Sequence, residues 1–469
     1  MPENLILRQW SETLGRRGDA PAIVGPNGEV LRSFAHIEAD AQRARDALQG
    51  RGGIGPGDVV ALQLGNSPWL PGWLLALWRA GAVPVLLERS ISGTARETAL
   101  ATCRARAWIG WSNSDIDAVR EGATYETRLL DGAPFTDDTQ FLKLTSGTTG
   151  APRAIRFTAA QLVADCDSIW TAMGFRDGDL NFGVIPWSHS YGFSNLITPL
   201  LCRGLPVVAT EDRLPRAILA ELERTRATIF PGLPIFFQKL AELEATPLPA
   251  LRLCLSAGAP LSASVAAAFR ARYGLKVHGF YGSSECGGIA YDASEHEVHE
   301  GCVGQPMPAA AVEFEDAANS DEPVRLRVRG SAVGLGYFPE PDDSVLSKGT
   351  FTPGDLVRRT SDGLVLAGRV SDFINIAGRK LNPTSVEAVL RSCPGVCDAV
   401  VFGVPHPIRG EEPIACVAGH ASAEALLALC ARELPAWQVP RDFWLVQTLP
   451  VNERGKLNRR ALAEAYRTK

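Results

Sequence analysis

The sequence predicts an α/β protein with a large N-terminal domain of mostly parallel sheets with helices, plus a small α+β C-terminal domain. Short apolar segments alternate with helix-like segments through most of the chain, which is the pattern of parallel sheets covered by helices. A separate set of strand-like and helix-like segments follows Gly368. With 469 residues, the chain also exceeds the size at which a single core stops growing. We therefore expect a large domain over residues 1–368 and a small one over residues 369–469.

The first elements are predicted from periodicity and from residues that end helices. Ser33 is placed to cap a helix, because apolar residues recur with a helical period over 34–48. A glycine-rich stretch ends this helix, and "VVALQL" (59–64) follows as a buried strand. The most apolar run, 68–87, contains one arginine, two glycines and three prolines. We expect this run to be a buried helix that leads into a buried strand, not a membrane span.

The middle of the chain supplies strands whose ends are expected to bind a ligand. Short apolar segments are separated there by predicted helices at 215–226 and 262–273. The strand segments are "NFGVIP" (181–186), "GLPVVA" (204–209), "ATIFPG" (227–232), "LRLCLSAG" (251–258) and "KVHGFYG" (276–282). Parallel strands bring their carboxyl-end loops to one edge of the sheet, so we expect the ligand crevice there. In the small domain, Asn382 and Pro383 are predicted to open a helix.

The composition argues against several classes of function. A hydrophobic content of 46%, a charged content of 21% and a net charge of −5 are typical of a globular protein without nucleic acid or an anionic membrane as partner. The ten cysteines are scattered through apolar stretches, which is typical of reduced thiols in a cytoplasmic protein. Cys393 and Cys397 are expected to be buried small side chains rather than a redox or metal pair. The first residues show no secretory signal. We therefore expect a cytoplasmic protein with no membrane span.

The stretch "LTSGTTGAPR" (144–153) is the first candidate binding site. It follows the apolar "FLKL", so a strand is expected to end in a loop there. Glycines allow the backbone to approach a phosphate closely, and hydroxyls and a cation can donate hydrogen bonds to its oxygens. The stretch is not a Walker A loop, which needs GxxxxGK followed by Ser or Thr. A solvated turn rich in Ser, Thr and Gly is the alternative that this stretch alone leaves open.

Further segments follow in order along the chain. They are "FYGSSECGG" (280–288), "TPGDLV" (352–357), "GRVSDFINIAGRKLNP" (368–383) and "LPVNERGKLNRRAL" (449–462). With these segments in this order, the sequence resembles the adenylate-forming (AMP-binding) superfamily, and in particular its acyl/aryl-CoA synthetases, over essentially the whole chain. The resemblance implies that ATP activates a carboxylic acid as acyl-AMP with release of pyrophosphate. It also implies that the small C-terminal domain is mobile.

The resemblance assigns roles to individual residues. Lys456 is implied to reach the substrate carboxylate, Glu285 to bind Mg²⁺, and Arg369 to contact the ribose, and these three are the implied catalytic residues. The residues implied to bind ATP are Thr145, Ser146, Gly147, Thr148, Thr149, Gly150, Arg153, Gly258, Ala259, Pro260, Tyr281, Gly282, Ser283, Ser284 and Asp355. Asp355 would accept hydrogen bonds from the ribose hydroxyls. For Glu285, Asp355 or Lys456 taken alone, an ordinary solvated residue is the alternative.

Some positions depart from the common pattern of the family. Arg153 stands where lysine is common, which keeps the charge but changes its geometry. Ser284 replaces a threonine and keeps the hydroxyl. Ser371 stands where Asp or Lys is common, and Asn375 stands where lysine is frequent. No catalytic group is lost. Ser371 and Asn375 lie near the predicted hinge between the two domains, so the sequence does not determine how this hinge moves or how the acyl group is transferred in the second half-reaction.

The segment "VIPWSHSYGFSN" (184–195) resembles the part of the family that lines the acyl pocket. Relatives that activate amino acids need an acid here to pair with the substrate ammonium, because burying that charge alone is costly. This segment has no acid, so an apolar aryl or fatty acid is the favoured substrate. The predicted pocket residues are Trp187, His189, Ser190, Tyr191, Phe230, Gly287 and Gly288, the two glycines leaving room in the wall. A structural histidine at 189, and a core position for any single aromatic residue, are the alternatives.

These features together predict an acid–thiol ligase. ATP and Mg²⁺ would serve acyl-AMP formation, and the acyl group would then pass to coenzyme A (CoA) or to the phosphopantetheine of an acyl carrier protein. The alternatives are a non-catalytic member that binds nucleotide or a partner protein, a stand-alone adenylating enzyme with another acceptor, and an adenylating oxygenase like luciferase. The intact set of Glu285, Asp355 and Lys456 favours the enzyme, since a protein that only binds has no need of all three. The sequence does not identify the acid, the acceptor or the oligomeric state.

Overall fold

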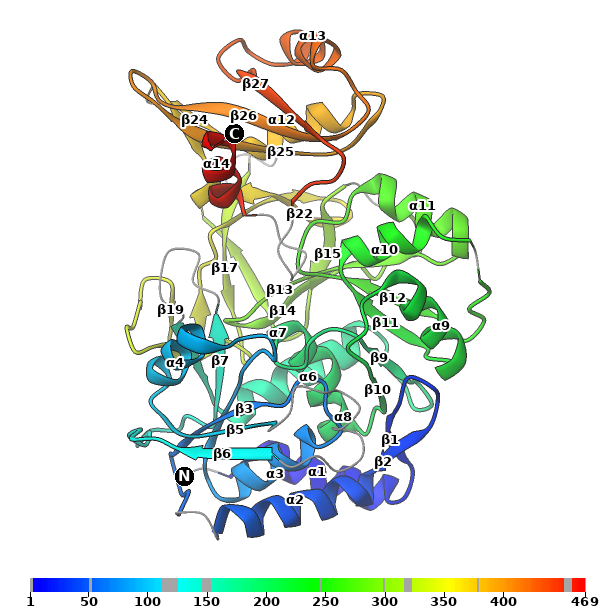
Figure 1. Ribbon diagram of the computed structural model, residues 1–469, viewed down its shortest axis with the longest axis vertical. Helices are drawn as coiled ribbons and strands as arrows, with labels where there is room; N and C mark the ends of the chain where they lie inside the picture. Colours follow the sequence, from blue (N-terminus) through cyan, green and yellow to red (C-terminus); the bar gives the residue numbers. More distant parts are fainter. Residues whose placement is uncertain are drawn as a thin grey trace. The chain divides into compact units, whose positions relative to one another are not determined.

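The computed structural model describes residues 3–49, 53–111, 125–145, 153–244, 246–297, 300–315, 323–377, 379–450 and 458–468. Its contacts divide the chain into two compact units. The first unit contains Met1–Glu313 and Arg327–Thr352, and the second contains Phe314–Leu326 and Pro353–Lys469. Both units combine helices with sheets (Figure 1), so the predicted α/β class is confirmed.

The larger sheet of the first unit has a parallel centre. From β15 to β2, its strands run in the order β15-β14-β13-β12-β11-β9-β10-β1-β2, all within this unit. Their bounds are β1 Pro21–Val24, β2 Val30–Ser33, β9 Asn181–Gly183, β10 Val207–Ala209, β11 Ile229–Gly232, β12 Leu253–Ser256, β13 Val277–Ser283, β14 Gly287–Tyr291 and β15 Cys302–Pro306. The run from β13 to β1 is parallel, and β14, β15 and β2 are antiparallel to their neighbours. The central strands match the apolar segments predicted from the sequence.

The second sheet of this unit leads to the phosphate-loop stretch. Its order is β18-β8-β7-β4-β3-β5-β6, with β3 parallel to both β4 and β5, and β4 parallel to β7. The bounds are β3 Val59–Gln63, β4 Val83–Leu86, β5 Ala105–Trp111, β6 Tyr125–Leu129, β7 Phe141–Thr145, β8 Arg153–Phe157 and β18 Gly336–Phe338. Strands β3 and β4 are buried along their whole length, as expected for strands inside a parallel sheet.

Helices cover these sheets, and their capping residues follow the sequence signals. Those of the first unit are α1 Leu5–Arg17, α2 Phe34–Gln49, α3 Leu70–Arg79, α4 Gly93–Thr102, α6 Ala159–Ala172, α7 Ser190–Gly192, the π-helical turn η1 Phe193–Ile197, α8 Thr198–Arg203, α9 Pro215–Thr225, α10 Pro234–Ala241 and α11 Ala263–Tyr273. The Ser33 hydroxyl accepts a hydrogen bond from the His36 amide at 3.2 Å, which confirms the predicted cap of α2. The run 68–87 forms α3 and β4, as predicted.

The second unit contains a hairpin and a smaller sheet. Strand β21 (Asp355–Thr360) pairs antiparallel with β22 (Gly363–Arg369). The sheet has the order β24-β23-β26-β25, with β27 on β26. Its elements are β23 Ile374–Ile376, β24 Arg379–Leu381, β25 Val396–His406, β26 Gly410–Gly419, β27 Asp442–Val446, the 3₁₀ turn η2 Val370–Asp372, and the helices α12 Pro383–Arg391, α13 Ala423–Glu433 and α14 Arg459–Arg467. Asn382 caps α12 as predicted, since its side chain accepts a hydrogen bond from the Thr384 amide at 3.2 Å.

Short strands complete the description. They are β16 Ala311–Phe314, β17 Val324–Arg329, β19 Leu346–Ser347 and β20 Thr350–Phe351.

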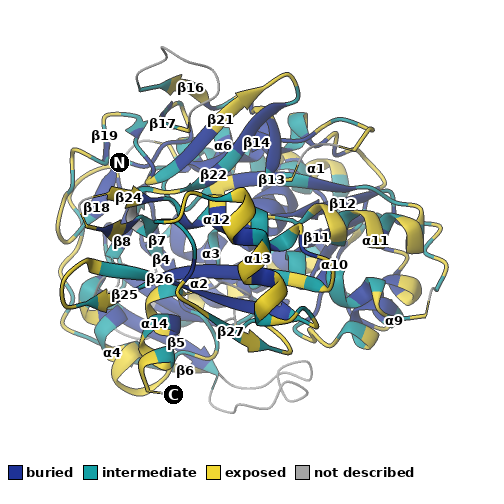
Figure 2. Ribbon diagram, turned by 90° about the horizontal axis from the view of Figure 1, so that it is seen from above, coloured by how far each residue is buried: buried dark blue, intermediate teal, exposed yellow. Residues whose placement is uncertain are grey.

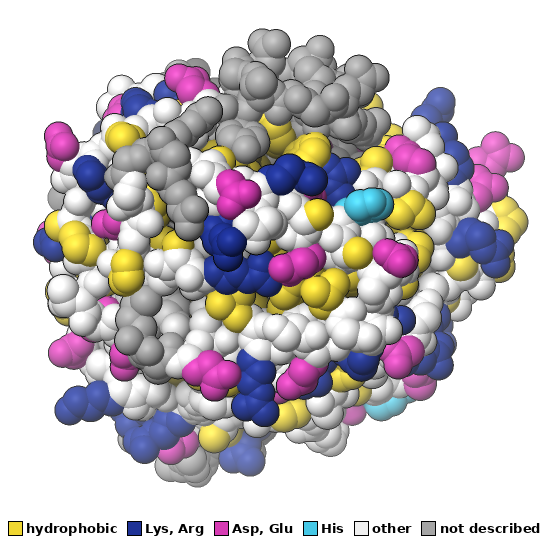
Figure 3. Space-filling view, turned by 90° about the horizontal axis from the view of Figure 1, so that it is seen from below, with side chains coloured by type: hydrophobic (Ala, Val, Ile, Leu, Met, Phe, Trp, Pro, Cys, Tyr) yellow, Lys and Arg dark blue, Asp and Glu magenta, His cyan; other side chains and the backbone are white. Residues whose placement is uncertain are grey.

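Figure 2 shows buried strands in dark blue and exposed faces in yellow on α4, α11 and α13. Figure 3 shows one face of the molecule on which basic, acidic and hydrophobic side chains are interspersed. Within the described parts of the chain, no helix is both long enough and apolar enough to cross a membrane.

The cysteines are free thiols, and most of them are buried. Cys393 is buried as expected, but Cys397 is exposed, so the expectation of burial is wrong for that residue. The register of β25 against β26 shifts between Val396 and Asp398. A bulge of this kind leaves the extra residue outside the ladder, and here it turns Cys397 to solvent.

The turn between β13 and β14 depends on a glycine. Gly287 has a φ of +70°, a conformation that residues with a Cβ rarely adopt. A Cβ on Gly287 would also overlap the carboxylate of Asp165 on α6. The backbone at residue 287 and the buried carboxylate of Asp165 are therefore closer together than any residue with a Cβ at position 287 would permit.

We predict that Gly287→Ala lowers the free energy of unfolding by more than Gly274→Ala does. Gly274 has a matching φ of +71° but nothing within 4 Å of its Cβ position, so this control measures only backbone strain, roughly 1–2 kcal/mol. Gly287→Ala adds the displacement of Asp165 to the same strain. Urea unfolding of both variants measures the difference, and equal losses would show that the close approach contributes nothing.

Candidate functional site

The base of the phosphate-loop stretch lies between β7 and β8. Thr145 and Arg153 are paired in register across these antiparallel strands. The Thr145 hydroxyl also donates to the carbonyl oxygen of Arg153 at 3.1 Å. The predicted loop residues Ser146, Gly147, Thr148, Thr149 and Gly150 lie outside the described residues. The two described ends of the stretch, Thr145 and Arg153, are therefore joined by strand pairing and by this hydrogen bond.

Arg153 and Glu285 are joined through a residue that the sequence analysis missed. The Arg153 guanidinium lies 3.8 Å from the ring centre of Tyr337, and the Tyr337 hydroxyl donates to Oε1 of Glu285 at 2.9 Å. Oε2 of Glu285 accepts a hydrogen bond from the Ser283 hydroxyl. Burial raises the pKa of Tyr337, and the negative charge of Glu285 raises it further, so the tyrosine stays a neutral donor.

Strand pairing explains how Tyr337 reaches this place. Strand β18 pairs antiparallel with β8, so Tyr337 lies opposite Ile155 although the two are far apart in the sequence. The available signal was the short segment "GYFP", in which a buried tyrosine needs a partner for its hydroxyl. Nothing in that segment indicates which partner, because the partner comes from another strand pair.

The Ser283–Ser284 turn is linked to the segment predicted to line the acyl pocket. The Ser190 hydroxyl donates to the Ser284 hydroxyl at 2.8 Å. Burial raises the pKa of Tyr191, whose hydroxyl donates to the carbonyl oxygen of Leu255 at 3.3 Å. His189 accepts a hydrogen bond from the Tyr191 amide at 3.4 Å, so at least one ring nitrogen has a structural use. These contacts tie the predicted pocket segment to β12 and to the Glu285 turn.

Several predicted pocket residues lie in the packed interior. Trp187 and Phe230 are both 0% exposed, and Phe230 lies 5.1 Å, ring centre to ring centre, from Phe237. The space beside Gly287 is filled by Asp165, and a Cβ on Gly288 would lie 2.6 Å from the sulfur of Met307. The expectation that the two glycines leave room in a pocket wall is therefore wrong, because protein atoms fill that room.

Two groups of the residues predicted to bind ATP lie at one edge of the sheet. Ser256 on β12 lies in register with Gly279 on β13, so residues 258–260, just after β12, and Tyr281, near the end of β13, lie at the same edge. Gly258 has a φ of +87° and is exposed, whereas Tyr281 is buried, with 7% of its surface accessible. The carboxyl edge expected to carry the crevice therefore carries residues 258–260 and Tyr281, which were predicted to bind ATP.

The second unit holds the other predicted polar residues. Asp355 and Arg369 lie in register on β21 and β22, and the Arg369 Nε donates to Oδ1 of Asp355 at 2.6 Å. The Asp355 side chain is 14% exposed and that of Arg369 is 55% exposed. Lys456 lies outside the described residues. The structure thus pairs two of the three residues predicted in this part of the chain.

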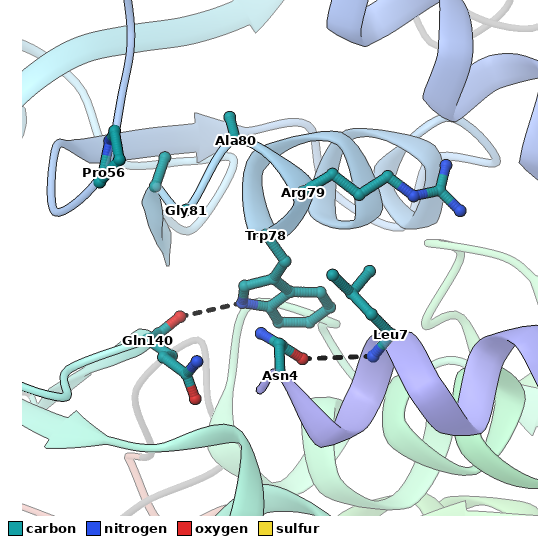
Figure 4. Close-up of a pocket in the computed structure, with 9 residues that line it drawn as sticks. Asn4, Leu7, Pro56, Trp78, Arg79, Ala80, Gly81 and Gln140 are labelled. Atoms are coloured by element: carbon teal, nitrogen blue, oxygen red, sulfur yellow. Dashed lines mark hydrogen bonds between the residues drawn. The ribbon is translucent and has the colours of Figure 1, made fainter. Parts of the chain in front are cut away.

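A cavity of about 470 Å³ lies elsewhere in the first unit. Its lining includes Asn4, Pro56, Trp78 and Gln140, and Figure 4 shows the Trp78 indole directed at the carbonyl oxygen of Gln140, 2.9 Å away. Pro56 and Gln140 precede strands β3 and β7, so this cavity lies at the amino ends of these strands. Ligands of such sheets bind at the carboxyl ends, and none of the predicted site residues lines this cavity.

Comparison with known proteins places these features in a family. The family model named AMP-binding enzyme matches residues 10–338, and the family model named AMP-binding enzyme C-terminal domain matches residues 385–456. Feruloyl-CoA synthase from an Amycolatopsis species is 28% identical over 97% of this chain and 98% of that protein. Naringenin synthase from Pestalotiopsis fici is 28% identical over 95% of this chain, which spans only 18% of that protein.

A solved structure shares the fold. ATP-bound MatB from Rhodopseudomonas palustris superposes with a TM-score of 0.84 at 22% identity, over 98% of this chain and 99% of that one. At this identity the likeness concerns the fold. The matched family model covers well over half of the sequence, including the phosphate-loop stretch and the segment 280–288. This chain belongs to the AMP-binding enzyme family.

Proposed function

We propose that this protein activates an apolar carboxylic acid with ATP and transfers the acyl group to a thiol. The observation that carries the proposal is the connected group of Arg153, Tyr337 and Glu285 at the base of a loop rich in Ser, Thr and Gly. It places a cation and a carboxylate beside a stretch suited to phosphates. Family membership supports ATP as the nucleotide.

In the first step, an oxygen of the substrate carboxylate attacks the α-phosphorus of ATP. The bond to the bridging oxygen breaks, and pyrophosphate leaves with the electron pair. Two anions approach each other in this reaction, so a site must supply positive charge where negative charge develops. Arg153 supplies a guanidinium, which stays charged and can contact two phosphate oxygens at once. Its guanidinium lies over the ring of Tyr337, a contact that limits how far the side chain can move.

Glu285 fits the role of magnesium ligand. Each of its oxygens accepts one hydrogen bond, from Tyr337 and from Ser283, and each keeps a lone pair for a cation. The carboxylate is partly exposed, as it must be to face a nucleotide. Bound Mg²⁺ would neutralise phosphate charge, and a protein commonly holds it through one or two carboxylates. Asp355 and Lys456 are proposed to serve the ribose and the substrate carboxylate.

In the second step, a thiol attacks the acyl carbon, AMP leaves, and a thioester forms. The acceptor is CoA or the phosphopantetheine of a carrier protein. Support for a thiol comes from the relative named feruloyl-CoA synthase, which is matched over nearly its whole length. The presence of Glu285, Asp355 and Lys456 in the sequence argues against a member that only binds nucleotide.

An aryl acid is the favoured substrate. The segment 184–195 contains no acid that could pair with a substrate ammonium. Feruloyl-CoA carries an aromatic acyl group, and naringenin is an aromatic product, so both of these relatives handle aromatic compounds. A fatty acid is the second candidate, because the segment contains aromatic and aliphatic side chains and no Asp, Glu, Lys or Arg.

We predict that aryl acids drive ATP-dependent pyrophosphate release and that α-amino acids do not. The screen supplies aryl, short, medium and long acids and α-amino acids one at a time, with reactions lacking acid as the blank. CoA and carrier protein are then added separately, and thioester is measured by mass spectrometry. Release with α-amino acids alone would reject the proposed substrate class.

We predict that Tyr337→Phe raises the Mg²⁺ concentration needed for half-maximal acyl-AMP formation by about 10–100-fold. The phenylalanine keeps the ring under Arg153 but removes the hydroxyl that orients Glu285. Tyr273→Phe is the matched control, since its hydroxyl donates to a carbonyl oxygen of Leu240 at 2.9 Å, away from these residues. Magnesium titrations of both variants decide the matter, and identical curves would contradict the role of Tyr337.

We predict that Lys456→Ala slows acyl-AMP formation by on the order of 10²–10³, or about 3 kcal/mol, the cost of removing one contact that stabilises developing charge. It should still convert chemically prepared acyl-AMP to thioester, because a mobile C-terminal domain carries the lysine away in that step. Single-turnover kinetics of both half-reactions measure this, with Lys239→Ala on α10 as control. An equal loss in both half-reactions would argue against alternation of the small domain.

A further inference from the structure

A buried ionic group lies behind the candidate site in the first unit. Lys143, Ser194 and Asp165 are 5%, 4% and 3% exposed, respectively. The Lys143 Nζ donates to the Ser194 hydroxyl at 3.4 Å, and that hydroxyl donates to Oδ2 of Asp165 at 2.6 Å. Oδ1 of Asp165 accepts a hydrogen bond from the backbone amide of Gly288 at 2.9 Å. Both oxygens of the buried carboxylate are therefore used.

Burying these charged groups costs desolvation free energy, so a contribution to stability does not by itself explain the arrangement. Burial lowers the pKa of Lys143, while the negative charges of Asp165 and Glu285 oppose that shift. The Lys143 Nζ also lies 4.7 Å from the ring centre of Phe157. Apolar side chains of similar volume would often be as stable as a buried ion pair. A buried ionic group is better suited to fixing the position of the segments that it joins.

The group joins segments that each carry candidate site residues. Lys143 lies on β7, just before Thr145 and the phosphate-loop stretch. Ser194 lies in the turn η1, within the segment 184–195 that also contains His189 and Ser190. Gly288 is the second residue of β14, which follows the Glu285 turn. Asp165, on α6, is the common acceptor, and the glycine at 287 is what lets the carboxylate come so close.

We propose that Asp165, supported by Lys143 and Ser194, is a positioning residue that holds the Glu285 turn in register for acyl-AMP formation. The inference rests on the proposed function and deepens it. Asp165 acts through the Gly288 amide and the backbone of the turn, and it touches no reacting atom. Loss of its acceptor oxygens frees the start of β14, and Glu285 then binds Mg²⁺ less well.

Two neutral double variants separate positioning from charge. Lys143→Met/Asp165→Asn removes both buried charges but keeps an oxygen that accepts from Gly288 and an amide that donates to Ser194. Lys143→Met/Asp165→Leu removes the same charges and the acceptor as well. We expect the leucine variant to need about 10–100-fold more Mg²⁺ for half-maximal acyl-AMP formation, and to have a lower kcat, while the asparagine variant stays close to the unsubstituted chain. Equal Mg²⁺ requirements in the two doubles would overturn the proposal.

A remote buried pair controls for simple destabilisation. Asp179 is 3% exposed, pairs with Arg252, and accepts from the Thr228 hydroxyl at 2.9 Å. These residues precede strands β9, β11 and β12, at the edge of the sheet opposite the candidate site. Asp179→Asn should lower the urea midpoint without changing the Mg²⁺ requirement. A changed requirement in this variant would show that the requirement reports stability and would overturn the proposal.

Two further measurements keep the test decisive. If the leucine variant does not fold, Ser194→Ala takes its place in the test, because this change removes only the hydroxyl between Lys143 and Asp165. Ser194→Ala must then raise the Mg²⁺ requirement, and an unchanged requirement overturns the proposal. Should the unsubstituted chain release no pyrophosphate with any acid, the proposed function fails, but amide hydrogen exchange at residues 285–289 still tests the positioning. We expect faster exchange there in the leucine double, or in Ser194→Ala if that double does not fold, than in the asparagine double. Equal exchange overturns the proposal.

Discussion

The hydrogen bond from the Tyr337 hydroxyl to Glu285 is the interaction on which the candidate site depends. It joins β18 to the turn after β13, and the same tyrosine ring lies under the guanidinium of Arg153 at the start of β8. One aromatic side chain thus sets the distance between a cation and a carboxylate from distant parts of the sequence. A phenolic group suits this position because its apolar ring tolerates burial while its hydroxyl needs only one partner.

Two carboxylates near this turn have different tasks because their surroundings differ. Asp165 is almost fully buried, and its two oxygens accept hydrogen bonds from the Ser194 hydroxyl and the Gly288 amide. Glu285 is partly exposed and keeps acceptor capacity after its bonds to Tyr337 and Ser283. The first carboxylate suits a structural anchor and the second a ligand for a cation. Side-chain type alone does not distinguish these tasks, whereas burial and hydrogen-bond partners do.

Each compact unit fixes its own candidate residues by strand pairing. Arg153 and Glu285 belong to the first unit, and the paired Asp355 and Arg369 belong to the second. Strand register holds Arg153 opposite Thr145 across β7 and β8, and Asp355 opposite Arg369 across β21 and β22. Register is a robust way to fix a side chain, since a slip by one residue would turn it to the opposite face of the sheet.

The sequence by itself determined the fold class, the family, the central strands and several helices of the large unit, and the start of helix α12 in the small one. These follow from local signals: helical periodicity with Ser33 and Asn382 as caps, apolar runs for the central strands, and motifs in a fixed order. Only the tertiary structure decided that Tyr337 joins Arg153 to Glu285, that Asp165 and Met307 fill the space beside Gly287 and Gly288, and that a bulge exposes Cys397. Such contacts depend on strand pairing and close packing between residues far apart in the chain, and no local pattern encodes which distant residue becomes the neighbour.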